Sequence, residues 1–118
     1  ASSLRLSAKM AASPGRILFC NPDNLEYSGK HGPSYNLNRD RKNLTVKLSY
    51  DDCQTWPVRK VLDPGVSAYS DLALSPRGTI YCLYERDGVN GSMWDPRYVT
   101  FARFSLGWLT DGKDRLSK

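Results

Sequence analysis

The sequence predicts an all-β fold made of short antiparallel strands. Its apolar residues fall in runs of strand length, several of which alternate with polar residues. Turn-forming Pro, Gly, Asn and Asp residues bound most of these runs, and no stretch repeats with the period of a helix. With 118 residues, of which 40% are hydrophobic, the chain has the size of about one small domain with a moderate core.

Three strand signals lie in the first half of the chain. Residues 3–7 alternate between polar and apolar side chains, and residues 17–20 form an apolar run that ends at an Asn-Pro pair. Residues 43–49 alternate again, which is typical of a strand with one buried face. The polar segment 23–40 between them predicts a long loop, and loops of this length are usually functional or disordered.

Four more strand signals follow in the second half. Asp63-Pro64-Gly65 predicts a turn between the first two, and Arg77-Gly78 predicts the next turn. From Thr110 the chain is polar, and we expect residues 110–118 to form a frayed tail. The four strands are expected at residues 58–62, 71–74, 80–84 and 99–104, which gives seven with the three above.

Charge and cysteine content argue against several classes of function. The formal net charge is +5, but the Lys and Arg residues are scattered, which does not favour nucleic-acid binding. No apolar run is long enough to span a bilayer. Three cysteines without CxxC spacing favour free thiols over a zinc site or a disulfide framework. His31 cannot form a metal site alone, so we expect neither metal nor cofactor.

One turn carries a family resemblance. Residues 49–56, SYDDCQTW, resemble the Asp-box, Ser-x-Asp-x-Gly-x-Thr-Trp, of the six-bladed propellers of the sialidase family. An aspartate in such a turn can bond backbone amides while the tryptophan packs between strands. Cys53 replaces the glycine of the pattern, so a positive φ there would cost about 1 kcal/mol. The resemblance implies a structural role, at the outer rim and away from substrate, for Ser49, Asp51, Thr55 and Trp56.

Further motifs flank this turn in the order found in sialidases. The resemblance covers nearly the whole chain and implies roughly two four-stranded blades of a six-bladed β-propeller. We therefore expect residues 1–109 to be the C-terminal part of a sialidase propeller domain. The matching segments are residues 17–22 (ILFCNP), 41–45 (RKNLT), 67–72 (SAYSDL), 83–85 (LYE) and 101–109 (FARFSLGWL).

Three of these residues match functional positions of the family. Tyr69 matches the tyrosine nucleophile of a retaining exo-α-sialidase, and a phenol avoids the repulsion that a carboxylate would meet at a carbon bearing a carboxylate. Arg41 matches one of three arginines that bind the substrate carboxylate through bidentate bonds. Glu85 matches the glutamate that orients another of these arginines. We expect all three at one end of the propeller.

Each assignment has a plainer alternative. Tyr69 is also compatible with an aromatic residue that packs on a strand, and Glu85 with a simple charge at a sheet edge. Arg41 is one of several basic residues, and only its spacing to Leu44 and Thr45 favours it over Arg39. The whole chain also suits a non-catalytic Asp-box module that binds glycans or proteins, or a trans-sialidase.

The resemblance also implies what the chain lacks. No stretch matches the other two arginines, the glutamate base or the acid/base aspartate of the family, and six blades need far more than 118 residues. We expect the chain alone to be inactive. Its expected partners are a sialylated glycoconjugate and the N-terminal remainder of the same sialidase. Asn43 and Asn90 match the N-glycosylation acceptor pattern, which favours a secreted or lysosomal location over a cytoplasmic one.

Overall fold

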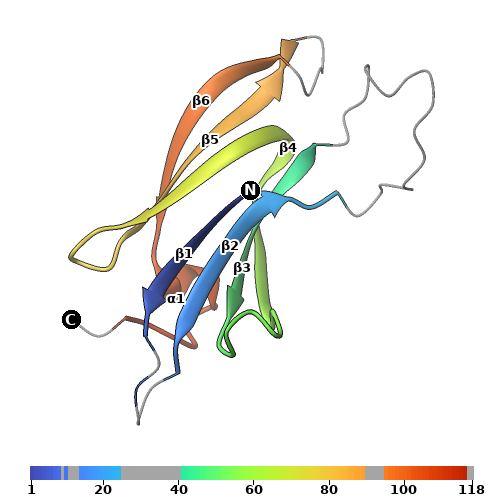
Figure 1. Ribbon diagram of the computed structural model, residues 1–118. Coiled ribbons are helices and arrows are strands. Elements are labelled where there is room, and N and C mark those ends of the chain that lie inside the picture. The colour runs from blue at the N-terminus through green and yellow to red at the C-terminus, as the bar shows by residue number, and fades with distance from the viewer. Residues whose placement is uncertain (9, 11–13, 25–40, 90–94, 117–118) are drawn as a thin grey trace.

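The chain forms an antiparallel sheet whose strands follow sequence order (Figure 1). The computed structural model describes residues 1–8, 10, 14–24, 41–89 and 95–116, and the structural statements below concern these residues. They contain six strands and one short helix, so the all-β prediction is confirmed. The elements are β1 (Ser2–Ser7), β2 (Arg16–Pro22), β3 (Lys42–Ser49), β4 (Val58–Leu74), β5 (Ile80–Gly88), β6 (Pro96–Phe104) and α1 (Leu106–Leu109).

The long strand β4 belongs to two parts of the sheet. It pairs with β3 through residues 58–66 and with β5 through residues 67–74. We call β1, β2, β3 and residues 58–66 the first sheet part, and residues 67–74, β5 and β6 the second sheet part. The described strands thus resemble one four-stranded and one three-stranded blade that share a strand.

The predicted turn at Asp63-Pro64-Gly65 is wrong, because these residues lie within β4 and do not reverse the chain. Proline cannot donate to the ladder, and the pairing of β3 with β4 shifts register at Leu44. The Gly65 N–H donates to the Asp63 carboxylate at 2.8 Å instead. These three residues therefore lie where β4 changes its pairing partner from β3 to β5. Because β4 is continuous here, the described residues form six strands and not the predicted seven.

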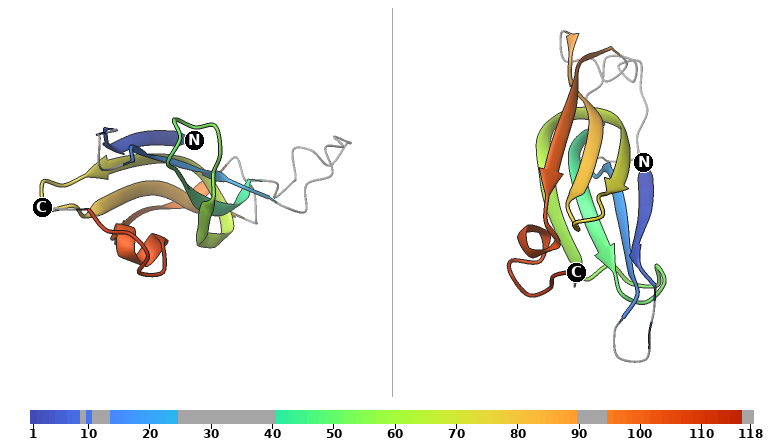
Figure 2. Two further views of the ribbon diagram at one scale, coloured as in Figure 1. Left: turned by 90° about the horizontal axis from the view of Figure 1, so that it is seen from below. Right: turned by 90° about the vertical axis from the view of Figure 1, so that its left-hand side faces the viewer.

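The core lies between the two sheet parts, because the sheet curls (Figure 2). The Ser2 and Ser70 hydroxyl oxygens are 3.3 Å apart, which brings β1 next to the second half of β4. Cys20 and Cys82 are free and fully buried in this core, as expected of small hydrophobic residues, whereas Cys53 is exposed in a turn. Residues of both parts form one buried cluster, which includes Leu18, Val46, Leu48, Leu72, Ile80 and Phe104.

The C-terminal segment is anchored, and the expected frayed tail is wrong as far as residue 116. Ser105 caps α1 by accepting the Trp108 N–H at 3.0 Å, and both Leu106 and Leu109 are buried. After the helix, Thr110 is 4% exposed and its hydroxyl oxygen accepts the Asp114 N–H at 2.9 Å. Local hydrogen bonds therefore turn the chain back onto the sheet.

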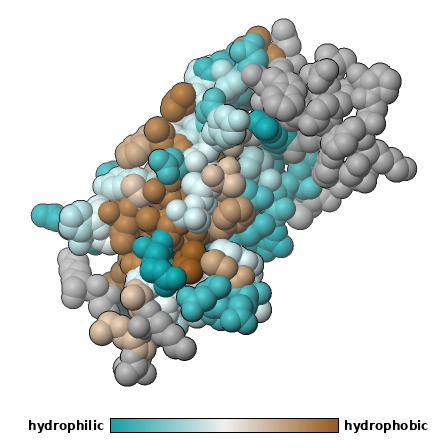
Figure 3. All heavy atoms as spheres, viewed as in Figure 1, coloured by the Kyte–Doolittle hydropathy of each residue, from teal (hydrophilic) through white to brown (hydrophobic). Residues whose placement is uncertain are grey.

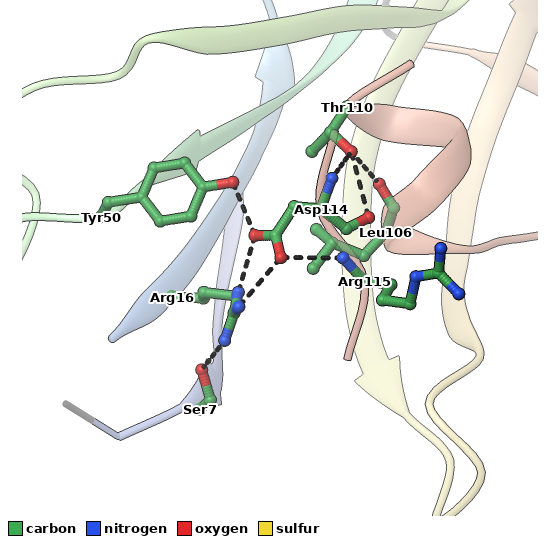
Figure 4. Close-up of polar contacts among 7 residues, drawn as sticks. All are labelled: Ser7, Arg16, Tyr50, Leu106, Thr110, Asp114 and Arg115. Carbon is green, nitrogen blue, oxygen red and sulfur yellow. Dashed lines mark hydrogen bonds and ion pairs between the residues drawn. The ribbon is translucent and has the colours of Figure 1, made fainter. Parts of the chain in front are cut away.

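An ion-pair network joins this segment to the first sheet part (Figure 4). The Arg16 guanidinium donates to both Asp114 carboxylate oxygens, at 2.8 and 2.9 Å, and the Tyr50 hydroxyl donates to Asp114 at 2.7 Å. The hydrogen bonds from Arg16 hold the pKa of the Asp114 carboxyl below its usual range. Burial, together with the bond to Asp114, raises the pKa of Tyr50 to about 12. We call Arg16, Tyr50 and Asp114 the tail anchor.

Some predicted features lie outside the described residues. They include most of the loop 23–40, with His31 and Arg39, and the acceptor Asn90. The acceptor Asn43 is described, but its amide group donates to the Asp23 carbonyl at 3.0 Å and Thr45 is 2% exposed, so this sequence is used within the fold. Within the described part of the chain, no helix has the length and apolar character needed to cross a membrane.

Candidate functional site

Tyr69 lies on a bulge of β4 and its side chain is 68% exposed. Ser67 pairs with Arg86 and Ser70 with Tyr84, so two residues of β4 oppose the single residue Glu85 of β5. Such bulges bend a strand and redirect a side chain, and they are frequent beside active sites. The phenol therefore points away from the core, although the preceding residue Ala68 is buried.

Arg41 lies immediately before β3 and reaches the same end of the sheet. Its guanidinium carbon is 5.6 Å from the centre of the Tyr69 ring, within the range of a cation–π contact. The main-chain carbonyl of Arg41 accepts the Ser67 N–H at 2.9 Å, which fastens β4 directly before the bulge. The structure thus brings Arg41 and Tyr69 together from strands that pair elsewhere along their length.

Glu85 contacts the main chain of Tyr69. Its carboxylate accepts the Tyr69 main-chain N–H at 3.3 Å. The three predicted residues therefore meet at one end of the sheet, where Arg41 contacts the ring of Tyr69 and Glu85 contacts its main chain. Their roles toward a substrate stay predictions, because all of these contacts are between residues of the same chain.

A small pocket of about 250 Å³ lies beside the Tyr69 side chain. Its side walls include the apolar residues Leu83 and Val99, which are 47% and 69% exposed. Complete ligand sites enclose roughly 300–1,000 Å³, so the described residues form only part of a site of ordinary size. The lining residues are Tyr69, Ser70, Asp71, Leu83, Tyr84, Glu85 and Val99.

Sequence reasoning did not single out Asp63 and Tyr84, which support this end of the sheet. The Tyr84 hydroxyl donates to the Asp63 carboxylate at 3.1 Å. Burial and the neighbouring Asp63 charge raise the pKa of Tyr84 to about 12, so the phenol stays a donor at neutral pH. No local signal predicts this pair, because Asp63 belongs to a sequence typical of a turn.

The Asp-box residues lie at the opposite end of β3 from Arg41. The Asp51 carboxylate accepts the Thr55 N–H at 2.8 Å and the Thr55 hydroxyl at 2.5 Å, and the Ser49 hydroxyl donates to it at 2.8 Å. These bonds lower the pKa of Asp51, the largest contribution being the Thr55 hydroxyl. At about 3.3 Å per residue, eight residues of β3 separate this turn from Arg41 by about 26 Å.

The remaining box positions complete the turn. The Trp56 ring packs on Phe19, with ring centres 5.9 Å apart, and so connects the turn to β2. Cys53 has φ of 71°, which is the left-handed conformation that glycine adopts most easily. The positive φ considered from the sequence is therefore present. Among the residues that the structure describes, no group of three or more His, Cys, Asp or Glu residues is placed to hold a metal ion.

Comparison with known proteins gives one curated relative and several structures. No protein-family model matches the chain. A sialidase from Micromonospora viridifaciens is 42% identical over 69 residues, which are 58% of this chain and 9% of that protein. The solved structure of the Hadza microbial sialidase Hz136 is 28% identical, with a TM-score of 0.61, over 92% of this chain and 17% of the other.

Two more distant structures share the fold. The leech intramolecular trans-sialidase, solved with 2,7-anhydro-Neu5Ac, is 19% identical with a TM-score of 0.62, over 93% of this chain and 16% of that one. The intramolecular trans-sialidase from Ruminococcus gnavus, solved with oseltamivir carboxylate, is 18% identical with a TM-score of 0.61, over 92% and 22%. The matched part of this chain therefore spans between 9% and 22% of the length of the four proteins named above.

Proposed function

This chain belongs to the sialidase family, and we propose that it is the C-terminal part of an exo-α-sialidase that releases terminal sialic acids from glycoconjugates. The observation that carries the proposal is the meeting of Tyr69, Arg41 and Glu85 at one end of the sheet. A non-catalytic module has no need to gather these three side chains from separate strands around an exposed phenol.

In this proposal Tyr69 is the nucleophile. Its hydroxyl oxygen attacks the anomeric carbon while the bond to the aglycone breaks, which forms a covalent glycosyl–enzyme intermediate. A base takes the phenol proton and an acid protonates the departing aglycone oxygen, and both groups are proposed to come from the remainder of the sialidase. Water then displaces Tyr69 with net retention of configuration. The exposure of the phenol, 68%, leaves its hydroxyl accessible to a substrate. Because sialic acid carries a carboxylate on the reacting carbon, a phenol reaches it without the charge repulsion that an Asp or Glu nucleophile would meet.

Arg41 binds the substrate carboxylate in the proposed complex. A planar guanidinium offers two parallel N–H groups to a carboxylate, which lysine cannot do. The distance of 5.6 Å between the Arg41 guanidinium carbon and the centre of the Tyr69 ring supports this role, because the positive charge lies near the proposed nucleophile. Attraction of the anionic substrate and orientation of its anomeric carbon toward Tyr69 therefore come from one side chain.

The rest of the site is proposed to come from the remainder of the same sialidase. The second sheet part has an outer face with large exposed apolar residues, which are Tyr69, Leu83, Val99 and Phe101. Hydrophobic residues are also visible over β4, β5 and β6 in Figure 3. A curated relative more than ten times longer than the matched stretch has enough chain to cover this face with a further blade, whereas the chain alone leaves it open.

The test is the substitution Tyr69→Phe in the complete polypeptide, assayed with a chromogenic α-sialoside. Removal of the nucleophilic oxygen is expected to lower kcat on the order of 10³-fold or more, because the covalent step is lost. Tyr81→Phe is the matched control. That residue lies on β5 and stacks on Phe101 with ring centres 5.1 Å apart, a contact that phenylalanine keeps.

The outcomes separate the candidate functions. Unchanged activity in Tyr69→Phe would refute the nucleophile, and no activity in the wild-type polypeptide would favour a binding module. Addition of lactose as an acceptor distinguishes hydrolysis from transfer, because a trans-sialidase would form sialyllactose. A monomeric 13.3 kDa chain that cleaves sialosides alone would overturn the need for the remainder.

A further inference from the structure

The bulge at Tyr69 leaves one main-chain donor without a partner in the ladder. Between the paired residues Ser67 and Ser70, strand β4 has two residues where β5 has only Glu85. The extra residue of such a bulge cannot pair in the regular way. At this position the Tyr69 N–H donates to the Glu85 side chain, at 3.3 Å from Oε1.

This contact fixes one of the two sides of the bulge. On the preceding side, the Arg41 carbonyl accepts the Ser67 N–H at 2.9 Å. On the other side, the Glu85 carboxylate accepts the main-chain N–H of Tyr69. Tyr69 is 68% exposed, so apart from the Arg41 guanidinium little packing holds its ring, and the backbone of the bulge contributes to the direction of the side chain.

We propose that Glu85 is a positioning residue that acts directly on the nucleophile, because its carboxylate binds the main-chain N–H of Tyr69 and sets the direction of the phenol. This inference rests on the proposed function. This positioning role differs from the arginine-orienting role in the chemical group that it needs at residue 85. Binding an N–H requires an oxygen at the right place, whereas orienting a guanidinium through an ion pair requires negative charge.

The experiment compares Glu85→Gln with Glu85→Ala in the complete polypeptide. Glutamine keeps the length of the side chain and an acceptor oxygen but removes the charge. We expect Glu85→Ala to lower kcat by about 10- to 100-fold with little change in KM, because a misdirected nucleophile slows the covalent step, and Glu85→Gln to lower kcat clearly less than Glu85→Ala. If Glu85→Ala does not fold, Glu85→Met, which has a similar length and no oxygen, takes its place.

A second measurement tests the contact without any activity. Amide hydrogen exchange at Tyr69 is expected to be about tenfold faster in Glu85→Ala than in wild type and unchanged in Glu85→Gln. Asp87→Asn is the matched control, because Asp87 lies on the same strand and its carboxylate instead accepts the Gly88 N–H at 2.8 Å. It should change neither exchange at Tyr69 nor kcat.

The outcomes distinguish failure of this inference from failure of the proposed function. An inactive wild-type polypeptide refutes the sialidase proposal, while amide exchange still tests the contact. Equal loss of kcat in Glu85→Gln and Glu85→Ala would overturn the inference in favour of a charge-dependent role. Unchanged exchange at Tyr69 in Glu85→Ala would overturn it directly.

Discussion

The two sheet parts differ in how their ends are secured. In the first sheet part, the Asp-box closes the turn between β3 and β4 with three bonds to the Asp51 carboxylate, and the tail anchor fastens the C-terminal segment to β2. The second sheet part carries Tyr69 and has an outer face with exposed apolar side chains such as Val99 and Phe101. One part is closed by polar side chains, and the other is left open beside the candidate nucleophile.

This difference separates support from chemistry along one pair of strands. Arg41 and the Asp-box stand at opposite ends of β3, so the bonds that hold the turn do not compete with those that would hold a substrate. The rigid end fixes the register of β3 against β4, and β4 continues from there to Tyr69. The open apolar face and the incomplete pocket lie next to each other. Both would be completed if a neighbouring blade packed against this face.

The largest effect is expected where the open face would be covered. Phe101, which is 63% exposed, would be buried against the remainder in the complete polypeptide. Phe101→Glu is therefore expected to destabilise that polypeptide by about 3 kcal/mol or more, because an unpaired charge would lose its water. In the chain alone the same change removes the stacking contact with Tyr81 and should cost only about 1 kcal/mol.

Urea unfolding of both forms gives the two free energies of unfolding. Phe101→Leu is the control, because leucine keeps an apolar surface of comparable reach and should leave both values nearly unchanged. If Phe101→Glu had a similarly small effect in both forms, the open face would be exposed to water in the complete polypeptide as well. The proposal that a further blade covers the second sheet part would then be refuted.

The next effect concerns the closed part. Asp114→Ala removes the acceptor of the tail anchor and leaves the Arg16 guanidinium and the Tyr50 hydroxyl without their partner, with side chains of Arg16 and Asp114 only 12% and 17% exposed. We expect a loss of about 2–3 kcal/mol in the free energy of unfolding. Asp111→Asn is the control, because asparagine tolerates the φ of 54° at this position, the carboxylate is 76% exposed, and its ion pair with Lys60 should matter little.

The pH dependence gives a signature of the same carboxylate. The pKa of Asp114 is lowered in the folded state, mainly by the hydrogen bonds from Arg16. Its stabilisation is therefore present above the unfolded pKa of about 3.9 and is lost as the pH falls through the lower folded pKa. Free energies of unfolding measured downward from pH 5 should fall less steeply in Asp114→Ala than in wild type, and parallel curves would contradict the role of the anchor.

Local patterns predicted most of the strands but not how they are joined. The alternation of Leu44, Val46 and Leu48 predicts one inward face, and all three are fully buried. The long strand β4 was missed because Asp63-Pro64-Gly65 has the composition of a turn, while its actual geometry depends on a change of pairing partner. The tail anchor was missed for a similar reason, since Arg16 and Asp114 are 98 residues apart.

The candidate site was also predictable only in part. The identities of Tyr69, Arg41 and Glu85 come from a resemblance to family motifs, and no periodicity in the chain reveals them. The bulge that turns Tyr69 outward arises from the register between β4 and β5, so neither strand alone encodes it. The Asp-box is the opposite case, because its bonds join residues at most four positions apart and its geometry is fixed locally.

The smallest effect concerns the one position where the Asp-box departs from its pattern. Cys53 has φ of 71°, and its N–H donates to the Ser49 hydroxyl oxygen at 2.9 Å, so the conformation is imposed by the turn. Cys53→Gly should relieve about 1–2 kcal/mol of steric strain and return part of it through the greater entropy of the unfolded chain. A net stabilisation of about 0.5–1 kcal/mol in urea unfolding is expected. Cys53→Ala, which removes the exposed thiol but keeps Cβ, should give no such gain, and equal stabilisation by both changes would place the cost in the sulfur instead of the backbone.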